Sequence, residues 1–229
     1  MMLAQHLGRR ALALALERGA ISRRVFSGAQ APAHTLVPPN CHGYVGPAGQ
    51  PDDFASARTL LAEAGFPGGK GLPVLSIQVL NDDKLPRTAE AIQAMWLREL
   101  GVQVTIEPFE QKTWIQNQQT LAHTVAPIGW TADFPDPITF LDLFRSGGGN
   151  NWTGWASPAY DELIRQAVAT ADPAGRRDYF QQAEALLLAA ALLLLVAALL
   201  VLLLLVAARA QRGNLLRGQR LPHKLLLLL

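Results

Sequence analysis

The order of strand-like and helix-like segments between residues 74 and 128 constrains the fold of this chain more than any other feature. Apolar runs typical of strands alternate there with amphipathic stretches typical of helices. We predict strands over residues 74–80, 102–106 and 124–128, and helices over residues 86–100 and 112–119. Strands and helices that alternate in this way build a sheet through crossover connections, so the sequence predicts an α/β lobe.

Start and stop signals predict further helices on the N-terminal side. Apolar side chains at helical spacing indicate a helix over residues 3–18 that ends at Gly19. A turn-rich connector over residues 27–51 follows it. The acidic pair at residues 52–53 can cap another helix, which stops at Gly65.

On the C-terminal side, a capping residue precedes a proline at residues 157–158 and again at 172–173, and each pair predicts a helix start. The glycine- and asparagine-rich run at residues 146–154 predicts a loop. It is not a phosphate-binding loop, because no Lys-Ser or Lys-Thr pair follows its glycines.

Charge and residue types exclude several functions. The chain has 20 basic and 18 acidic residues, and no basic cluster is interleaved with aromatics, so nucleic acid is not an expected partner. A single cysteine, Cys41, can form neither an internal disulfide nor a cysteine-based metal site. Asp133 and Asp136 could form an acid/base pair, but the nearby prolines favour structural roles, and no histidine or metal cluster accompanies the two carboxylates. His123 stands alone and is also assigned a structural role. We therefore predict no enzyme, no cofactor and no metal site.

The C-terminal region, residues 185–229, is of low complexity and predominantly apolar. Residues 185–208 are 24 consecutive Ala, Leu and Val residues, enough for a transmembrane helix, and every later charged residue is basic. Three interpretations stay open: a membrane anchor, degraded sequence, and a long buried helix. We accordingly divide the chain into a lobe over residues 1–184 and an apolar tail, with possible membrane contact through residues 185–208.

Several motifs in order and in register resemble one family, the oligopeptide- and dipeptide-binding proteins of bacterial ABC importers (extracytoplasmic solute-binding protein family 5). The resemblance extends from residue 5 to about residue 184. The matching runs are residues 9–16, 60–69, 89–96, 129–137, 140–142, 150–151 and 157–161. This resemblance implies a periplasmic-binding-protein type II-like lobe with a mixed sheet flanked by helices, here the second of two lobes that close on ligand. The chain would then be a truncated member whose first lobe and export signal lie outside this sequence.

The resemblance also implies a function and a site. The protein would bind short peptides on the periplasmic or extracytoplasmic side and deliver them to the permease and ATPase subunits of an importer. Asp133, in the segment Gly-Trp-Thr-Ala-Asp, would hold the free amino group, because one carboxylate in a closed cleft suffices for an ammonium. Gly129, Thr131, Trp130 and Asn151 are further predicted contacts, with Asn150 and Trp152 as weaker candidates.

Alternatives remain for these residues and for the function. Asp133 could instead form a turn before Pro135, and Trp130 could pack in the core. The chain could be a membrane-anchored accessory protein or a fragment that does not bind. The same scaffold could also take another solute, such as nickel, a dipeptide or a sugar.

Overall fold

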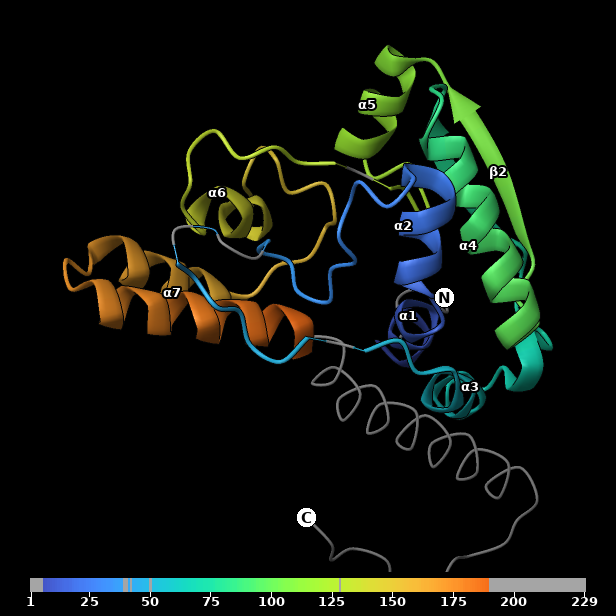
Figure 1. Ribbon diagram of the computed structural model, residues 1–229, viewed down its shortest axis with the longest axis horizontal. Helices are drawn as coiled ribbons and strands as arrows, with labels where there is room; N and C mark the ends of the chain where they lie inside the picture. Colours follow the sequence, from blue (N-terminus) through green and yellow to red (C-terminus); the bar gives the residue numbers. More distant parts are fainter. Residues whose placement is uncertain (1–5, 39–40, 42, 50, 128, 190–229) are drawn as a thin grey trace, which may run out of the picture.

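The computed structural model describes residues 6–38, 41, 43–49, 51–127 and 129–189. Its centre is a parallel pair of strands, β1 (Leu75–Leu80) and β2 (Val104–Phe109), joined by helix α4 (Leu85–Leu100). Figure 1 shows α4 lying along β2. The predicted unit of strand, helix and strand is confirmed, and with it the α/β class.

The remaining elements form two groups (Figure 1). Around the strand pair and α4 lie α1 (His6–Leu14), α2 (Arg18–Phe26), α3 (Phe54–Glu63), the 3-10 turn Pro67–Gly69 and α5 (Gln111–Gln119). To one side lie α6 (Ile138–Leu141), the 3-10 turn Asp142–Phe144, α7 (Pro158–Ala169) and a helix over residues 173–189. Proline follows a cap at the start of α7 and of the last helix, as predicted. Ser157 Oγ accepts the Tyr160 N–H, and Asp172 Oδ2 accepts the Gly175 N–H.

The sheet is smaller and simpler than predicted. The third strand, expected over residues 124–128, is reduced to one parallel bridge between Val125 and Ile77. Its backbone bonds join Gln78 N–H to Val125 O at 2.9 Å and Val125 N–H to Ser76 O at 3.2 Å. Every described strand contact is parallel, because a crossover connection returns the chain in the same direction each time. The expectation of a mixed sheet is therefore wrong for the described residues.

Strand β2 begins and ends later than the predicted strand over residues 102–106. It runs on through Pro108, which lies opposite Val79 in the register. Proline is tolerated there because β2 has one strand neighbour in the described sheet, and an edge strand can lack an outward N–H. The predicted strand is therefore too short at its C-terminal end.

The N-terminal helix prediction also needs correction. The expected helix over residues 3–18 ends early, as α1, and Gly19 lies inside α2. Arg18 begins α2 and binds Asp52 twice, through its backbone N–H at 3.1 Å and its guanidinium at 2.5 Å. This contact between distant segments holds the break between the helices, and local periodicity does not encode it.

Two apolar cores are present. The first lies between the sheet and helices α1, α3 and α4, and includes the fully buried side chains of Ile77, Val79 and Ala57. The second joins Leu36, Val37, Cys41 and Tyr44 to α6, α7 and the last helix, and contains the fully buried Tyr160 and Phe180. The second core holds the segments of the predicted site in place.

The predicted tail begins inside the last helix. Leu186 and Leu187 pack partly buried against the second core, so the boundary at residue 184 does not coincide with the end of an element. Among the helices that the structure describes, none is both long and apolar enough to cross a bilayer. From residue 190 onward, the span predicted over residues 185–208 lies outside the described residues.

Substituting Gly101 with alanine is expected to lower the free energy of unfolding by about 2 kcal/mol. Gly101 ends α4 at φ 67°, and an added Cβ would lie 2.3 Å from the carbonyl oxygen of Gly68. The matched control is Gly147→Ala, since Gly147 has φ 69° but open space around it, and should cost about 1 kcal/mol. Urea unfolding of both variants measures the difference, and equal losses would show that the contact with Gly68 does not matter.

Candidate functional site

The predicted ligand residues lie mainly in one exposed loop, residues 129–137. The loop follows the segment that bridges to β1 and precedes α6, so it leaves the sheet at the carboxyl end of a strand-like segment. Loops at that end of a parallel sheet are where α/β folds place ligands. Gly129, Trp130, Thr131 and Asp133 are all exposed there.

Trp130 is a surface residue of this loop. Its side chain is 40% exposed, and its indole N–H points to Thr139 Oγ1 at 3.4 Å. Phe134, from the same loop, is 52% exposed. The alternative that places Trp130 in the core is therefore wrong, and the loop presents two aromatic side chains to solvent.

The carboxylate of Asp133 has no hydrogen bond or ion pair with any residue that the structure describes. Asp136 makes the local bond expected of a turn-forming aspartate, because its Oδ1 accepts the Ile138 N–H at 3.0 Å. The turn is thus formed by Asp136. Asp133 keeps both carboxylate oxygens available to a cation.

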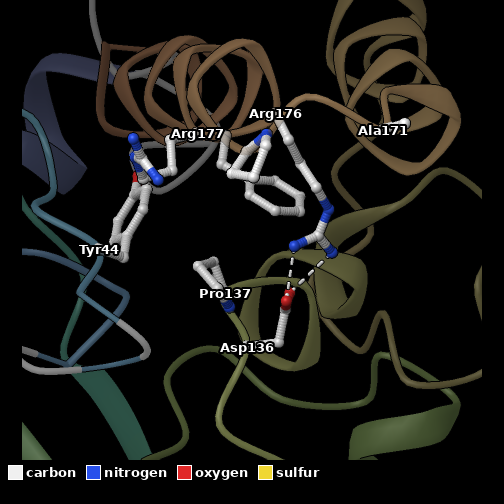
Figure 2. A pocket seen from close by; sticks show the side chains of 8 residues that line it. Tyr44, Asp136, Pro137, Ala171, Arg176 and Arg177 are labelled. Atoms are coloured by element: carbon white, nitrogen blue, oxygen red, sulfur yellow. Dashed lines mark hydrogen bonds and ion pairs between the residues drawn. The ribbon is translucent and has the colours of Figure 1, made fainter.

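Asp136 is paired with Arg176, a contact that spans 40 residues of sequence. Figure 2 shows the guanidinium of Arg176 reaching Asp136 from the last helix. The two bonds measure 2.6 and 3.0 Å, and the side chains are 30% and 19% exposed. An aspartate engaged in this bidentate pair is a poor general acid or base, which argues against the acid/base pair with Asp133.

Arg176 also packs on an aromatic ring. Its guanidinium carbon lies 4.7 Å from the ring centroid of Phe180, whose side chain is fully buried. The ring therefore fixes the guanidinium from one side while Asp136 fixes it from another.

Glu184 forms a second polar anchor on the same helix and is fully buried. Its Oε1 accepts the N–H groups of Leu36 and Val37 at 2.7 and 2.9 Å, and its Oε2 accepts the Tyr44 hydroxyl at 2.8 Å. Burial, and then the bond to Glu184, raises the pKa of Tyr44. This carboxylate connects Leu36, Val37 and Tyr44 to the last helix, a role that the sequence did not reveal.

A cavity of about 270 Å³ lies between these two anchors. Figure 2 shows Tyr44 and Arg177 on one side of it and the ion pair of Asp136 and Arg176 on another. Arg177 is exposed and makes no polar contact with the described residues. The cavity separates the loop of Asp133 from the segment containing Tyr44.

Asn151 lies in a different loop and bonds within it. Its amide nitrogen donates to the carbonyl oxygens of Arg145 and Trp155 at 3.0 and 2.8 Å, and its amide oxygen accepts from Thr153. The neighbouring Trp152 donates its indole N–H to Gly149 O at 3.0 Å. These bonds organise the predicted glycine-rich loop, and a ligand contact from Asn151 stays a prediction.

Residues with metal-binding or nucleophilic chemistry do not assemble into a second site. Within the part of the chain that the structure describes, no three His, Cys, Asp or Glu residues could hold a metal ion together. Burial, and then the charge of Asp136, raises the pKa of the Cys41 thiol, which disfavours the reactive thiolate. His123 Nδ1 lies 3.3 Å from the carbonyl oxygen of Asn117.

Comparison with known proteins identifies the family. The sequence pattern of the bacterial extracellular solute-binding proteins, family 5 middle region, matches residues 2–152. The oligopeptide-binding protein OppA of Bacillus subtilis is 33% identical over 190 residues, which cover 78% of this chain and 34% of that protein. The chain thus spans about a third of the length of the relatives that it matches.

Solved structures agree with the sequence comparison. The Escherichia coli murein tripeptide-binding protein MppA superposes with a TM-score of 0.77 at 27% identity, over 82% of this chain and 38% of that one. Haemophilus influenzae OppA in complex with the peptide RPPGFSPFR gives 0.74 at 29% identity, over 81% and 38%. The periplasmic-binding-protein type II-like class is confirmed by these neighbours. The chain belongs to family 5 of the bacterial extracellular solute-binding proteins, whose members are binding proteins and not enzymes.

Proposed function

We propose that this chain supplies part of the substrate-binding component of an ABC peptide importer and that Asp133 binds the free amino group of a short peptide. The observation that carries the proposal is the exposed Asp133 carboxylate, which makes no bond to a described residue. It lies in a loop whose C-terminal end is held by the bonds of Asp136. An ammonium group forms strong charge-assisted bonds to such a carboxylate. Relatives named for peptide binding support the ligand class.

The neighbouring residues suit a ligand that is held by its backbone. Gly129 and Thr131 are exposed and can offer backbone N–H and C=O groups to an extended peptide. Trp130 and Phe134 add apolar area beside the carboxylate. Recognition of backbone and ammonium groups would leave the ligand side chains free to vary.

The proposal places residues 1–184 in the second lobe of a hinged receptor. Another lobe would cover the loop and exclude water from the ion pair between the ligand and Asp133, which strengthens it. Permease and ATPase subunits of the importer are the proposed partners, and the extracytoplasmic side of the membrane is the proposed location. The part of the apolar run 185–208 that follows residue 189 would anchor the chain there if it crosses the bilayer.

Two alternatives are distinguished from this proposal by binding measurements. A membrane-anchored accessory protein or a non-binding fragment would remain folded but take no peptide. A protein that takes nickel or a sugar on the same scaffold would bind that solute and neither form of the peptide. The proposal therefore differs from both alternatives in the response to a peptide with a free amino group.

The test is a titration of the full chain in detergent micelles with trialanine and, separately, with N-acetyl-trialanine. The reporter is the Trp130 indole N–H in proton–nitrogen NMR spectra, assigned with the Trp130→Phe variant. We expect a saturable shift with trialanine and about a tenfold weaker response to the acetylated peptide. No response to either peptide from a folded chain would contradict the proposal in favour of one of the two alternatives, and equal responses would rule out recognition of the amino group.

A further inference from the structure

The loop that carries Asp133 has few internal contacts of its own. Between residues 129 and 137, the described backbone bond that closes within the loop joins the Asp136 N–H to Phe134 O at 2.8 Å. The indole of Trp130 adds a long bond to Thr139. An exposed segment with so few bonds depends on contacts from outside to hold one conformation.

Arg176 supplies such a contact at the C-terminal end of the loop. Its two bonds hold the Asp136 carboxylate, and the same carboxylate holds the start of α6 through Ile138. The pair is partly buried and bidentate, so it resists exchange with water better than an exposed ion pair does. Asp133 is three residues away, within about 10 Å along an extended chain.

The partner of Asp136 is itself held in place. Phe180 is fully buried in the second core, and its ring lies against the guanidinium of Arg176. The bonds of Glu184 fix the same helix further along. The ion pair that holds the loop is therefore connected to a buried part of the molecule and not to an exposed surface.

We infer that Arg176 is a positioning residue for ligand binding, which orients the carboxylate of Asp133 by holding Asp136 and so fixing the end of the loop. This inference rests on the proposed function of Asp133. A loop that is already ordered loses less conformational entropy when the ligand binds, so fixing it raises affinity without a direct contact. Arg176 acts through Asp136 and does not touch the peptide.

The test compares Arg176→Ala with Arg176→Lys and with a matched control, Arg165→Ala. Arg165 also donates two hydrogen bonds to one carboxylate, that of Glu162, but on the exposed surface of α7. In the free protein, we expect faster hydrogen exchange of the Asp136 and Ile138 amides in Arg176→Ala, because both hydrogen bonds depend on a held Asp136, with unchanged exchange in β1. Arg176→Lys keeps the charge but cannot make the two parallel hydrogen bonds of a guanidinium, so its exchange rate should be intermediate. The control should leave hydrogen exchange in the loop unchanged.

Affinity is measured on the same samples at a temperature where all variants are folded. Arg176→Ala should bind trialanine about tenfold more weakly than the wild type, and Arg165→Ala should bind normally. Unchanged loop exchange in Arg176→Ala, or unchanged affinity while Asp133→Asn loses binding, would overturn the inference. If loop exchange responds as expected but the wild type binds no peptide, the ion pair holds the loop and the proposed function is wrong, so the positioning role falls with it.

Discussion

Replacing Glu184 with alanine is expected to lower the free energy of unfolding by about 3 to 5 kcal/mol. The carboxylate is fully buried and accepts three hydrogen bonds, from Leu36, Val37 and Tyr44. Alanine would leave all three donors without a partner in an apolar core, and each buried donor so orphaned costs free energy. Chemical denaturation of the full chain, followed by tryptophan fluorescence, measures the loss.

Tyr44→Phe is the matched control for Glu184→Ala. It removes one of the three donors and leaves the carboxylate with both backbone N–H groups, so the loss should be about 1 kcal/mol. A loss of similar size in both variants would contradict the view that the backbone of residues 36 and 37 depends on Glu184. The Leu36 and Val37 amides should also exchange hydrogen faster in Glu184→Ala than in Tyr44→Phe.

Replacing Asp133 with asparagine is expected to weaken the binding of trialanine about 30-fold. Asparagine has nearly the same shape but no negative charge, so the ammonium group would lose a charge-assisted bond. Stability should be almost unchanged, because the carboxylate is exposed and makes no bond to a described residue. The same NMR titration of the Trp130 indole measures the affinity.

The control for this substitution is Glu63→Gln. Glu63 is likewise exposed, and its side chain makes no polar contact among the described residues, but it lies at the end of α3. The control substitution changes the net charge of the chain by the same amount. A loss of affinity in both variants would point to overall charge, and a loss in Asp133→Asn alone would point to the loop.

Local sequence signals predicted the central elements well. The alternation of β1, α4 and β2 is encoded by side-chain periodicity, and the ends of α3 and α4 by Asp53 and Gly101. Asp53 accepts the Ser56 N–H, and Gly101 adopts the left-handed conformation that ends a helix. These features depend on neighbours in the sequence and can therefore be found without a structure.

Contacts between distant segments could not be predicted in the same way. The break between α1 and α2 depends on Arg18 and Asp52, which are 34 residues apart, and the ion pair of Asp136 and Arg176 spans 40. Glu184 showed no local sign of a role, because its partners lie about 140 residues away. Motif resemblance located the loop of Asp133, but it did not show what holds that loop.

The most direct test of the central claim is the penalty of N-acetylation, measured as the ratio of trialanine to N-acetyl-trialanine affinity, in the wild type and in Asp133→Asn. If Asp133 binds the amino group, acetylation of the peptide should lower the affinity of the wild type about tenfold and leave that of the variant almost unchanged. The reason is that acetylation and the substitution remove the same interaction. An equal penalty in both proteins would contradict the account, since it would place the ammonium group at a residue other than Asp133.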